Sequence, residues 1–126
     1  MQRKFRLTRS EDFKRVRRSG RSYAHPLVVL IVEKNPQGGI RVGVAAGRAA
    51  GSAVRRNRAK RLLREAMRTL LPNVTLRLTQ DNASGADLIL IARAGLTSAT
   101  LEETRLALLN LLQRAQLYLP APTHDA

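Results

Sequence analysis

The chain has 126 residues, enough for one domain with a single hydrophobic core. It carries 23 Lys and Arg against 9 Asp and Glu, a formal net charge of +14, and contains no Cys. The lack of Cys excludes disulfides, thiolate nucleophiles and Cys-ligated zinc, and His25 and His124 are too few for a His-based metal site or triad. There is no apolar run of the roughly 20 residues that span a bilayer, and no signal-peptide pattern. We therefore expect a cytoplasmic protein without a membrane role.

The positive charge is concentrated in the first half of the chain. Residues 1–68 hold 19 basic and 4 acidic side chains, whereas residues 69–126 hold four basic and five acidic ones. A binding face built from the first half would produce this asymmetry, because it focuses positive potential toward a polyanion. Arg predominates over Lys, and its planar guanidinium suits phosphate. Nucleic acid is therefore favoured as the partner over an anionic membrane or an acidic protein.

The first elements predicted are a helix and two strands. Residues 8–19 form a short basic helix in this prediction, with a capping box at Thr8 and Glu11 and a stop at Gly20. Residues 27–32 are continuously apolar, as in a strand buried on both faces. Turn residues fill 35–39, and a second strand over 40–46 completes a predicted antiparallel hairpin.

The second half is predicted to alternate between helices and a strand. The longest helical pattern covers 52–71 and ends at Pro72, and 72–86 is predicted to be a loop. A third buried strand follows at 87–92. The last helix covers 100–118 and opens with a capping box at Thr100 and Glu103. We expect one nucleic-acid-binding domain over 1–119, a disordered tail over 120–126, and an α+β two-layer sandwich with a mixed sheet.

The helix predicted over 52–71 separates apolar from cationic side chains. With 100° per residue, one stripe is apolar and faces the core, and it contains Ala59, Leu62, Leu63, Ala66 and Leu70. The opposite stripe is polar and mostly cationic, and it contains Asn57, Lys60, Arg61, Arg64 and Arg68. Like charges at this spacing repel one another unless phosphates neutralise them. A solvated helix face and a nuclear-localisation signal are the alternative interpretations.

Three glycines precede this helix at four-residue intervals. This spacing predicts a tight connection from strand to helix, with glycines at Gly43, Gly47 and Gly51 and with Arg48 at the helix entrance. A nucleotide-binding P-loop is rejected because Gly-Lys-Ser/Thr is missing. Anion binding at the helix N-terminus remains reasonable.

The run Val54-Arg-Arg-Asn-Arg-Ala-Lys-Arg-Leu-Leu-Arg-Glu65, preceded by Arg41-Val-Gly-Val, resembles the signature of the bacterial ribonuclease P protein subunit. The first helix, the strand that begins at Asp87 and the helix that begins at Thr100 also occur in the family's order. The resemblance covers about residues 3–118. It implies an αβββαβα order with a left-handed βαβ crossover, a fold shared with a domain of a ribosomal protein.

The resemblance also implies a division of labour and a set of sites. The RNA subunit would be the catalyst, and the protein would bind it together with the 5′ leader of precursor tRNA. Mg²⁺ would be bound mainly by the RNA, and the protein would hold no catalytic residue. The RNA-binding set comprises the motif and its cationic neighbours: Arg48, Arg55, Arg56, Asn57, Arg58, Lys60, Arg61, Arg64 and Arg68. The leader cleft would contain Phe13, Arg17 and Arg9.

The chain departs from the family pattern at several positions. Many relatives carry an aromatic residue where Arg17 stands, often another where Leu30 stands, and commonly two Lys where this chain has Arg48 and Ala49. The leader cleft should therefore stack bases less and depend more on charge. Phe13 is equally compatible with a core position. Phe5 and Tyr23, which flank the same helix, are expected to be structural.

Three other functions are weighed against this one. A self-contained nuclease needs a general acid–base pair or clustered carboxylates, and the nine acids are scattered. A DNA-binding helix is disfavoured because a solid row of cations stands where base-reading residues would alternate, so no DNA partner is expected. A ribosomal protein or RNA chaperone fits the composition equally well and is separated only by the motif.

Overall fold

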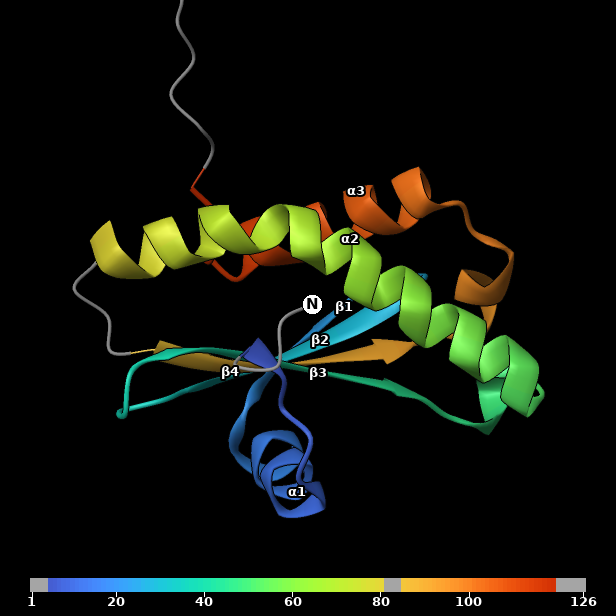
Figure 1. Ribbon diagram of the computed structural model, residues 1–126, viewed down its shortest axis with the longest axis horizontal. Helices are drawn as coiled ribbons and strands as arrows, with labels where there is room; N and C mark the ends of the chain where they lie inside the picture. The colour runs from blue at the N-terminus through green and yellow to red at the C-terminus, as the bar shows by residue number, and fades with distance from the viewer. Residues whose placement is uncertain (1–4, 81–84, 120–126) are drawn as a thin grey trace, which may run out of the picture.

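The computed structural model describes residues 5–80 and 85–119, which form one sheet with helices on both faces. The chain begins with α1 (Ser10–Ser19), β1 (Arg21–Ala24), β2 (Val28–Lys34) and β3 (Gly39–Ala46), as Figure 1 shows. It continues with the short 3-10 helix η2 (Arg48–Ala50), α2 (Ala53–Gln80), β4 (Gly85–Ala92), η3 (Ala94–Ser98) and α3 (Leu101–Arg114). This is the αβββαβα order that the resemblance implies.

The sheet is mixed and has the order β1-β2-β4-β3. β2 pairs antiparallel with both β1 and β4, whereas β3 pairs parallel with β4. The predicted hairpin over 27–46 is therefore wrong, because β4 lies between β2 and β3. β2 and β4 are the most apolar strands and take the central positions, while β3, with Arg41, Gly43 and small alanines, takes an edge. The parallel pair β3 and β4 is joined by α2, which forms the expected βαβ crossover.

Alternate residues of the strands feed two separate apolar clusters. Leu30, Leu88 and Leu90 face α2 and α3 and belong to the larger cluster. Ile31 and Ile89 face the other way and pack with Val16 of α1 and with Leu7. In Figure 1, α2 and α3 lie above the sheet and α1 lies below it. The sheet thus places α1 and the long helix α2 on opposite faces.

α1 begins two residues later than predicted. Arg9 is its N-cap and makes no side-chain capping bond, so the capping box expected at Thr8 and Glu11 is wrong. Instead, Asp12 of the first turn forms ion pairs with arginines. The helix ends before Gly20, as predicted, where a Cβ would come within 2.5 Å of the Val16 carbonyl oxygen. Gly20 therefore lets the chain turn from α1 into β1 against the sheet.

α2 continues through Pro72 to Gln80, so the predicted end at Leu71 and the loop over 72–80 are wrong. Pro72 is exposed, whereas Leu71 and Val74 are buried, so apolar packing on the inner face keeps the helix continuous despite the missing N–H. The side chain of Asn73 also donates to the carbonyl of Leu119 at 2.7 Å. Gly85 and Ala86, also predicted to be loop, begin β4. Residues 81–84, and the tail 120–126 predicted to be disordered, lie outside the described residues.

α3 begins with the predicted capping box. The Glu103 amide donates to the Thr100 hydroxyl at 3.0 Å, and the Thr100 amide donates to the Glu103 carboxylate at 2.9 Å. Hydrogen bonding to Thr100 lowers the pKa of Glu103, and the bond from the Thr100 backbone has a larger effect than that from its side chain. Within the described ranges, no helix is long and apolar enough to cross a membrane.

Candidate nucleic-acid interface

The first half of α2 presents the two faces that its sequence predicts. Ala59, Leu63, Ala66 and Leu70 are buried against the sheet and α3, and Leu62 is half-buried. On the other side, Asn57, Arg61 and Arg68 are exposed, and Lys60 and Arg64 are half-buried. Because the apolar stripe is held in the core, the cationic stripe is fixed toward solvent.

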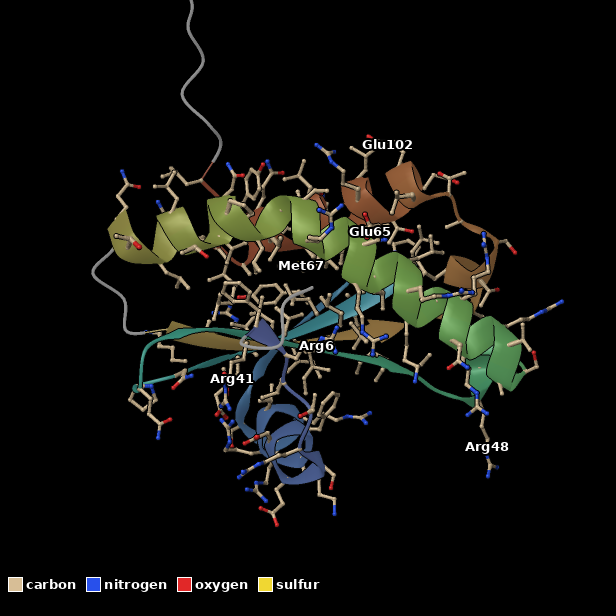
Figure 2. All side chains as sticks on the ribbon, viewed as in Figure 1. Arg6, Arg41, Arg48, Glu65, Met67 and Glu102 are labelled. Atoms are coloured by element: carbon tan, nitrogen blue, oxygen red, sulfur yellow. The ribbon has the colours of Figure 1, made fainter. Side chains whose placement is uncertain are left out.

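Most cations in the first half of α2 have no acidic partner. Arg68 donates to Glu65 at 2.6 Å, one turn away, and that hydrogen bond lowers the pKa of Glu65. Arg58 donates from Nε to the carbonyl of Thr97 at 3.2 Å. The others make no ion pair with any residue that the structure describes: Arg55, Arg56, Lys60, Arg61 and Arg64. Figure 2 shows Glu65 on the outer side of α2. The face therefore offers a row of uncompensated positive charge.

The passage into α2 is tight around Gly47 and Gly51, whereas Gly43, the third glycine of the predicted passage, lies inside β3. Gly47 precedes η2, and Gly51 follows it with a φ of 101°, a left-handed conformation that favours glycine. Ser52 then accepts a hydrogen bond from the Arg55 amide at 3.4 Å. Arg48 is exposed and extends away from α2, toward the side of the sheet that carries α1 (Figure 2). Arg48 is thus separated from the cationic row of α2.

The predicted leader residues lie on α1 with different degrees of burial. Phe13 is half-buried and packs against the cluster that contains Ile89 and Leu7. Arg17 and the N-cap Arg9 are exposed, and neither forms an ion pair with a described residue. Phe13 and Arg17 are four residues apart and share one flank of the helix. α1 and its N-cap therefore present one half-buried aromatic ring and two cations without an ion pair to a described residue, and their contact with a leader stays a prediction.

A hollow of about 180 Å³ at the edge of β3 brings the two predicted surfaces together. Its walls include Phe13 of α1, Val44 of β3 and Arg64 of α2. The segment before α1 also contributes, where the Leu7 amide donates to the Val42 carbonyl at 2.9 Å. Arg9 and Arg17 do not line this hollow. An RNA segment bound to α2 and another RNA segment bound beside α1 would therefore lie close together at the edge of β3.

The position of Leu30 differs from the expectation. Leu30 is fully buried under α2 and α3, on the face of the sheet opposite to α1. An aromatic residue at this position could not line a cleft beside α1. Ile31, the next residue along β2, packs with Val16 and faces α1. The sequence could not make this distinction because a strand that is apolar at every position does not reveal its register.

Other aromatic residues have mainly structural contacts. Phe5 and Tyr23 are half-buried and pack against the larger core cluster, as expected. The Arg21 guanidinium lies 5.7 Å from the centroid of the Tyr23 ring. Sequence reasoning missed another group, the buried Asp87 with its two arginine partners, Arg15 and Arg41. The available signal was an acidic residue inside an otherwise apolar strand.

Comparison with known proteins agrees with this geometry. The sequence model of the family described as Ribonuclease P matches residues 1–116. The ribonuclease P protein component of Herpetosiphon aurantiacus is 41% identical over 118 residues, covering 94% of this chain and 89% of the relative. That of Brevibacillus brevis is 37% identical over 126 residues, covering 99% and 94%.

Solved structures show the same fold. The RNase P protein of Staphylococcus aureus superposes with a TM-score of 0.72 at 25% identity, covering 91% of this chain and 98% of that one. The RNase P protein of Thermotoga maritima superposes with a TM-score of 0.71 at 30% identity, covering 86% and 96%. With its αβββαβα fold and its match over nearly the whole length, the chain belongs to the family of bacterial ribonuclease P protein components.

Proposed function

We propose that this protein component binds the RNA subunit of ribonuclease P through the cationic face of α2. The observation that carries the proposal is the row of unpaired cations, Lys60, Arg61 and Arg64, beside Asn57 on one fixed face. Stacked like charges destabilise a free helix, and bound phosphates relieve that repulsion. Asn57 can donate and accept, so it suits a base edge or a 2′-hydroxyl. Arg55, Arg56, Arg58 and Arg68 extend the same surface.

The second part of the proposal concerns the 5′ leader of precursor tRNA. The leader binds beside α1, where Phe13 offers a partly exposed ring and Arg9 and Arg17 offer unpaired charge. Arg48 adds a cation on the same side of the sheet (Figure 2). One ring allows little base stacking, so charge supplies most of the leader affinity. The hollow between Phe13 and Arg64 supports a continuous path between the two RNA surfaces.

The chemistry of cleavage is assigned to the RNA subunit. In the described part of the chain, no three His, Asp or Glu side chains come together as metal ligands. His25 is bound through Nδ1 to the Leu27 amide at 3.1 Å, in the turn before β2. We propose that Mg²⁺ is bound mainly by the RNA and that the protein raises substrate affinity. We assign this work to the cytoplasm, with no membrane and no DNA partner.

Cleavage of a precursor tRNA at low Mg²⁺ tests the proposal directly. Three samples are compared: this protein alone, a ribonuclease P RNA alone, and the two together. Accurate 5′ cleavage only in the mixture would support the division of labour. RNA binding without any stimulation would contradict it and would favour a general RNA-binding protein of ribosomal or chaperone type. Cleavage by the protein alone would contradict the assignment of catalysis to the RNA.

A further inference from the structure

A buried carboxylate lies between α1 and the sheet, away from the RNA-binding residues. Asp87, the third residue of β4, is 1% exposed, and it is the one buried acidic residue within the described ranges. The alternation along β4 places it on the same face as Ile89, toward α1. A carboxylate in such a position is costly unless its oxygens are well bonded.

Both oxygens of Asp87 are bonded by groups from three parts of the fold. Arg41 of β3 donates from Nε to Oδ1 at 3.0 Å and from Nη2 to Oδ2 at 2.8 Å. Arg15 of α1 donates to Oδ2 at 2.7 Å, and Asn35, which follows β2, donates to Oδ1 at 3.2 Å. Burial raises the pKa of Asp87, but the hydrogen bonds from Arg41 and Arg15 outweigh it and leave that pKa below its ordinary 3.8. The carboxylate is therefore ionised and ties α1 to the sheet.

Two further carboxylates surround the same arginines. Arg15 also pairs with Glu33 of β2, and it lies 3.3 Å from Asp12. Arg41 lies 3.8 Å from Asp12. Two arginines thus face three carboxylates, so this cluster has no excess positive charge in a chain with a net charge of +14. Figure 2 shows Arg41 beside α1 below the sheet. Such a patch does not attract phosphate.

The ion-pair cluster formed by Arg15, Arg41 and their carboxylates occupies only one flank of α1. Val16 is buried and marks the centre of the face that α1 packs against the sheet. A rotation of 100° per residue then places Phe13 and Arg17 on one flank of that face. Asp12 and Arg15 fall on the opposite flank. α1 has ten residues and one buried apolar side chain, so apolar packing alone anchors it weakly. The ion pairs of Arg15 therefore supply much of what orients the helix.

We propose that Asp87 is a positioning residue for leader binding. By holding Arg15 and Arg41, it fixes α1 against the sheet and closes the Asp12 flank to RNA. The leader then binds only along the flank of Phe13 and Arg17. This inference rests on the proposed function, in which the leader lies beside α1.

The variant Asp87→Asn tests the proposal in the reconstituted holoenzyme. It keeps the size of the side chain but removes the charge that holds the two arginines. We expect the affinity for a precursor tRNA with a long leader to fall by about tenfold, as for the loss of a charge-assisted hydrogen bond. The affinity for a substrate with a single-nucleotide leader, and for the RNA subunit, should not change. The matched control is Glu102→Gln on α3, an exposed carboxylate 3.5 Å from Arg105, which should change neither.

A second variant covers a failure of Asp87→Asn to fold. Arg15→Gln removes the contribution of α1 and leaves the pair of Arg41 and Asp87 intact. Because the Arg15 side chain is 34% exposed, its loss disturbs the core less. Arg15→Gln should likewise lower the affinity for the precursor tRNA with a long leader and leave the affinity for the substrate with a single-nucleotide leader unchanged. Equal losses for both substrates in either variant would mean that the cluster serves folding alone, and would overturn the proposal.

Crosslinking shows which flank the leader occupies. The chain has no Cys, so Ser10→Cys on the Phe13 flank and Ser19→Cys on the Asp12 flank each give one labelled site. With Asp87 intact, a photo-crosslinker should reach the leader from position 10 and not from position 19. With Asp87→Asn, crosslinks at position 19 should appear. Crosslinks from position 19 with Asp87 intact would overturn the inference alone. No leader crosslink from either position, together with no effect of leader length on affinity, would overturn the proposed leader site itself.

Discussion

The ring of Phe13 in α1 lies directly on Gly43 of β3. A Cβ added at Gly43 would come within 2.5 Å of the ring's Cζ and within 3.0 Å of the Leu7 carbonyl oxygen. The absence of a side chain at position 43 therefore lets the ring reach the sheet. Because Phe13 is only half-buried there, it both packs in the smaller cluster and remains accessible, so the core and cleft interpretations of this residue are compatible.

Substitution of Gly43 should therefore displace the ring. We expect Gly43→Ala to lower the free energy of unfolding by about 1–3 kcal/mol, the usual cost of overpacking. It should also weaken binding of a precursor tRNA with a leader. The control is Gly47→Ala, where a Cβ would meet nothing within 4 Å and φ is −86°. Urea denaturation of both variants checks the prediction, and equal stabilities would contradict the contact.

Pro72 interrupts the hydrogen bonding of α2 without ending it. Its ring is exposed, so the residue contributes little packing, and its missing N–H leaves the Arg68 carbonyl without the usual helix bond. Pro72→Ala should raise the free energy of unfolding by about 1–3 kcal/mol, given the helix propensities of the two residues. The control is Thr75→Ala, which is about one turn later and also exposed. It should raise the free energy of unfolding by only a few tenths of a kcal/mol. Thermal unfolding measures both, and a loss of stability in Pro72→Ala would contradict this account.

The features predictable from the sequence are those that depend on local patterns. The buried stripe of Ala59, Leu63 and Ala66 follows from helical periodicity, and the start of α3 follows from the capping box at Thr100. The cationic face of α2 is equally local. The predicted RNA-binding residues of α2 therefore lie where their spacing places them.

The features that could not be predicted depend on contacts between distant segments. β4 enters the sheet between β2 and β3 because the two most apolar strands share the centre, and no local pattern encodes that choice. Pro72 ends a helix in isolation, but packing of Val74 overrides that tendency. Asp87 meets Arg15 across 72 positions of sequence, so the ion-pair cluster is visible only in three dimensions.

Asp87 should make stability depend on pH. Because its pKa in the folded chain lies below the ordinary 3.8, folding favours the ionised form. Its contribution is therefore complete above the unfolded pKa and is lost as the pH falls through the lower, folded pKa. We expect Asp87→Ala to cost about 1–3 kcal/mol at neutral pH, as for a broken charged hydrogen-bond network whose arginines can turn to solvent. Urea denaturation at several pH values should show this difference shrinking below about pH 4. A difference that stays constant down to pH 2 would contradict the ionised network.

The salt dependence of RNA binding should distinguish the cations of α2 from one another. Each phosphate contact contributes counterion release, so Arg64→Ala or Lys60→Ala should reduce the slope of log K against log salt by about one. Arg68 already pairs with Glu65 at 2.6 Å, so Arg68→Ala should change the slope less. Conversely, Glu65→Gln should strengthen RNA binding because it releases Arg68. Arg114→Ala on α3 serves as the control for net charge, since Arg114 is exposed, makes no ion pair with a described residue and lies outside the cationic face. If Arg114→Ala and Arg64→Ala changed the slope equally, total charge would govern affinity, and α2 would have no special part in RNA binding.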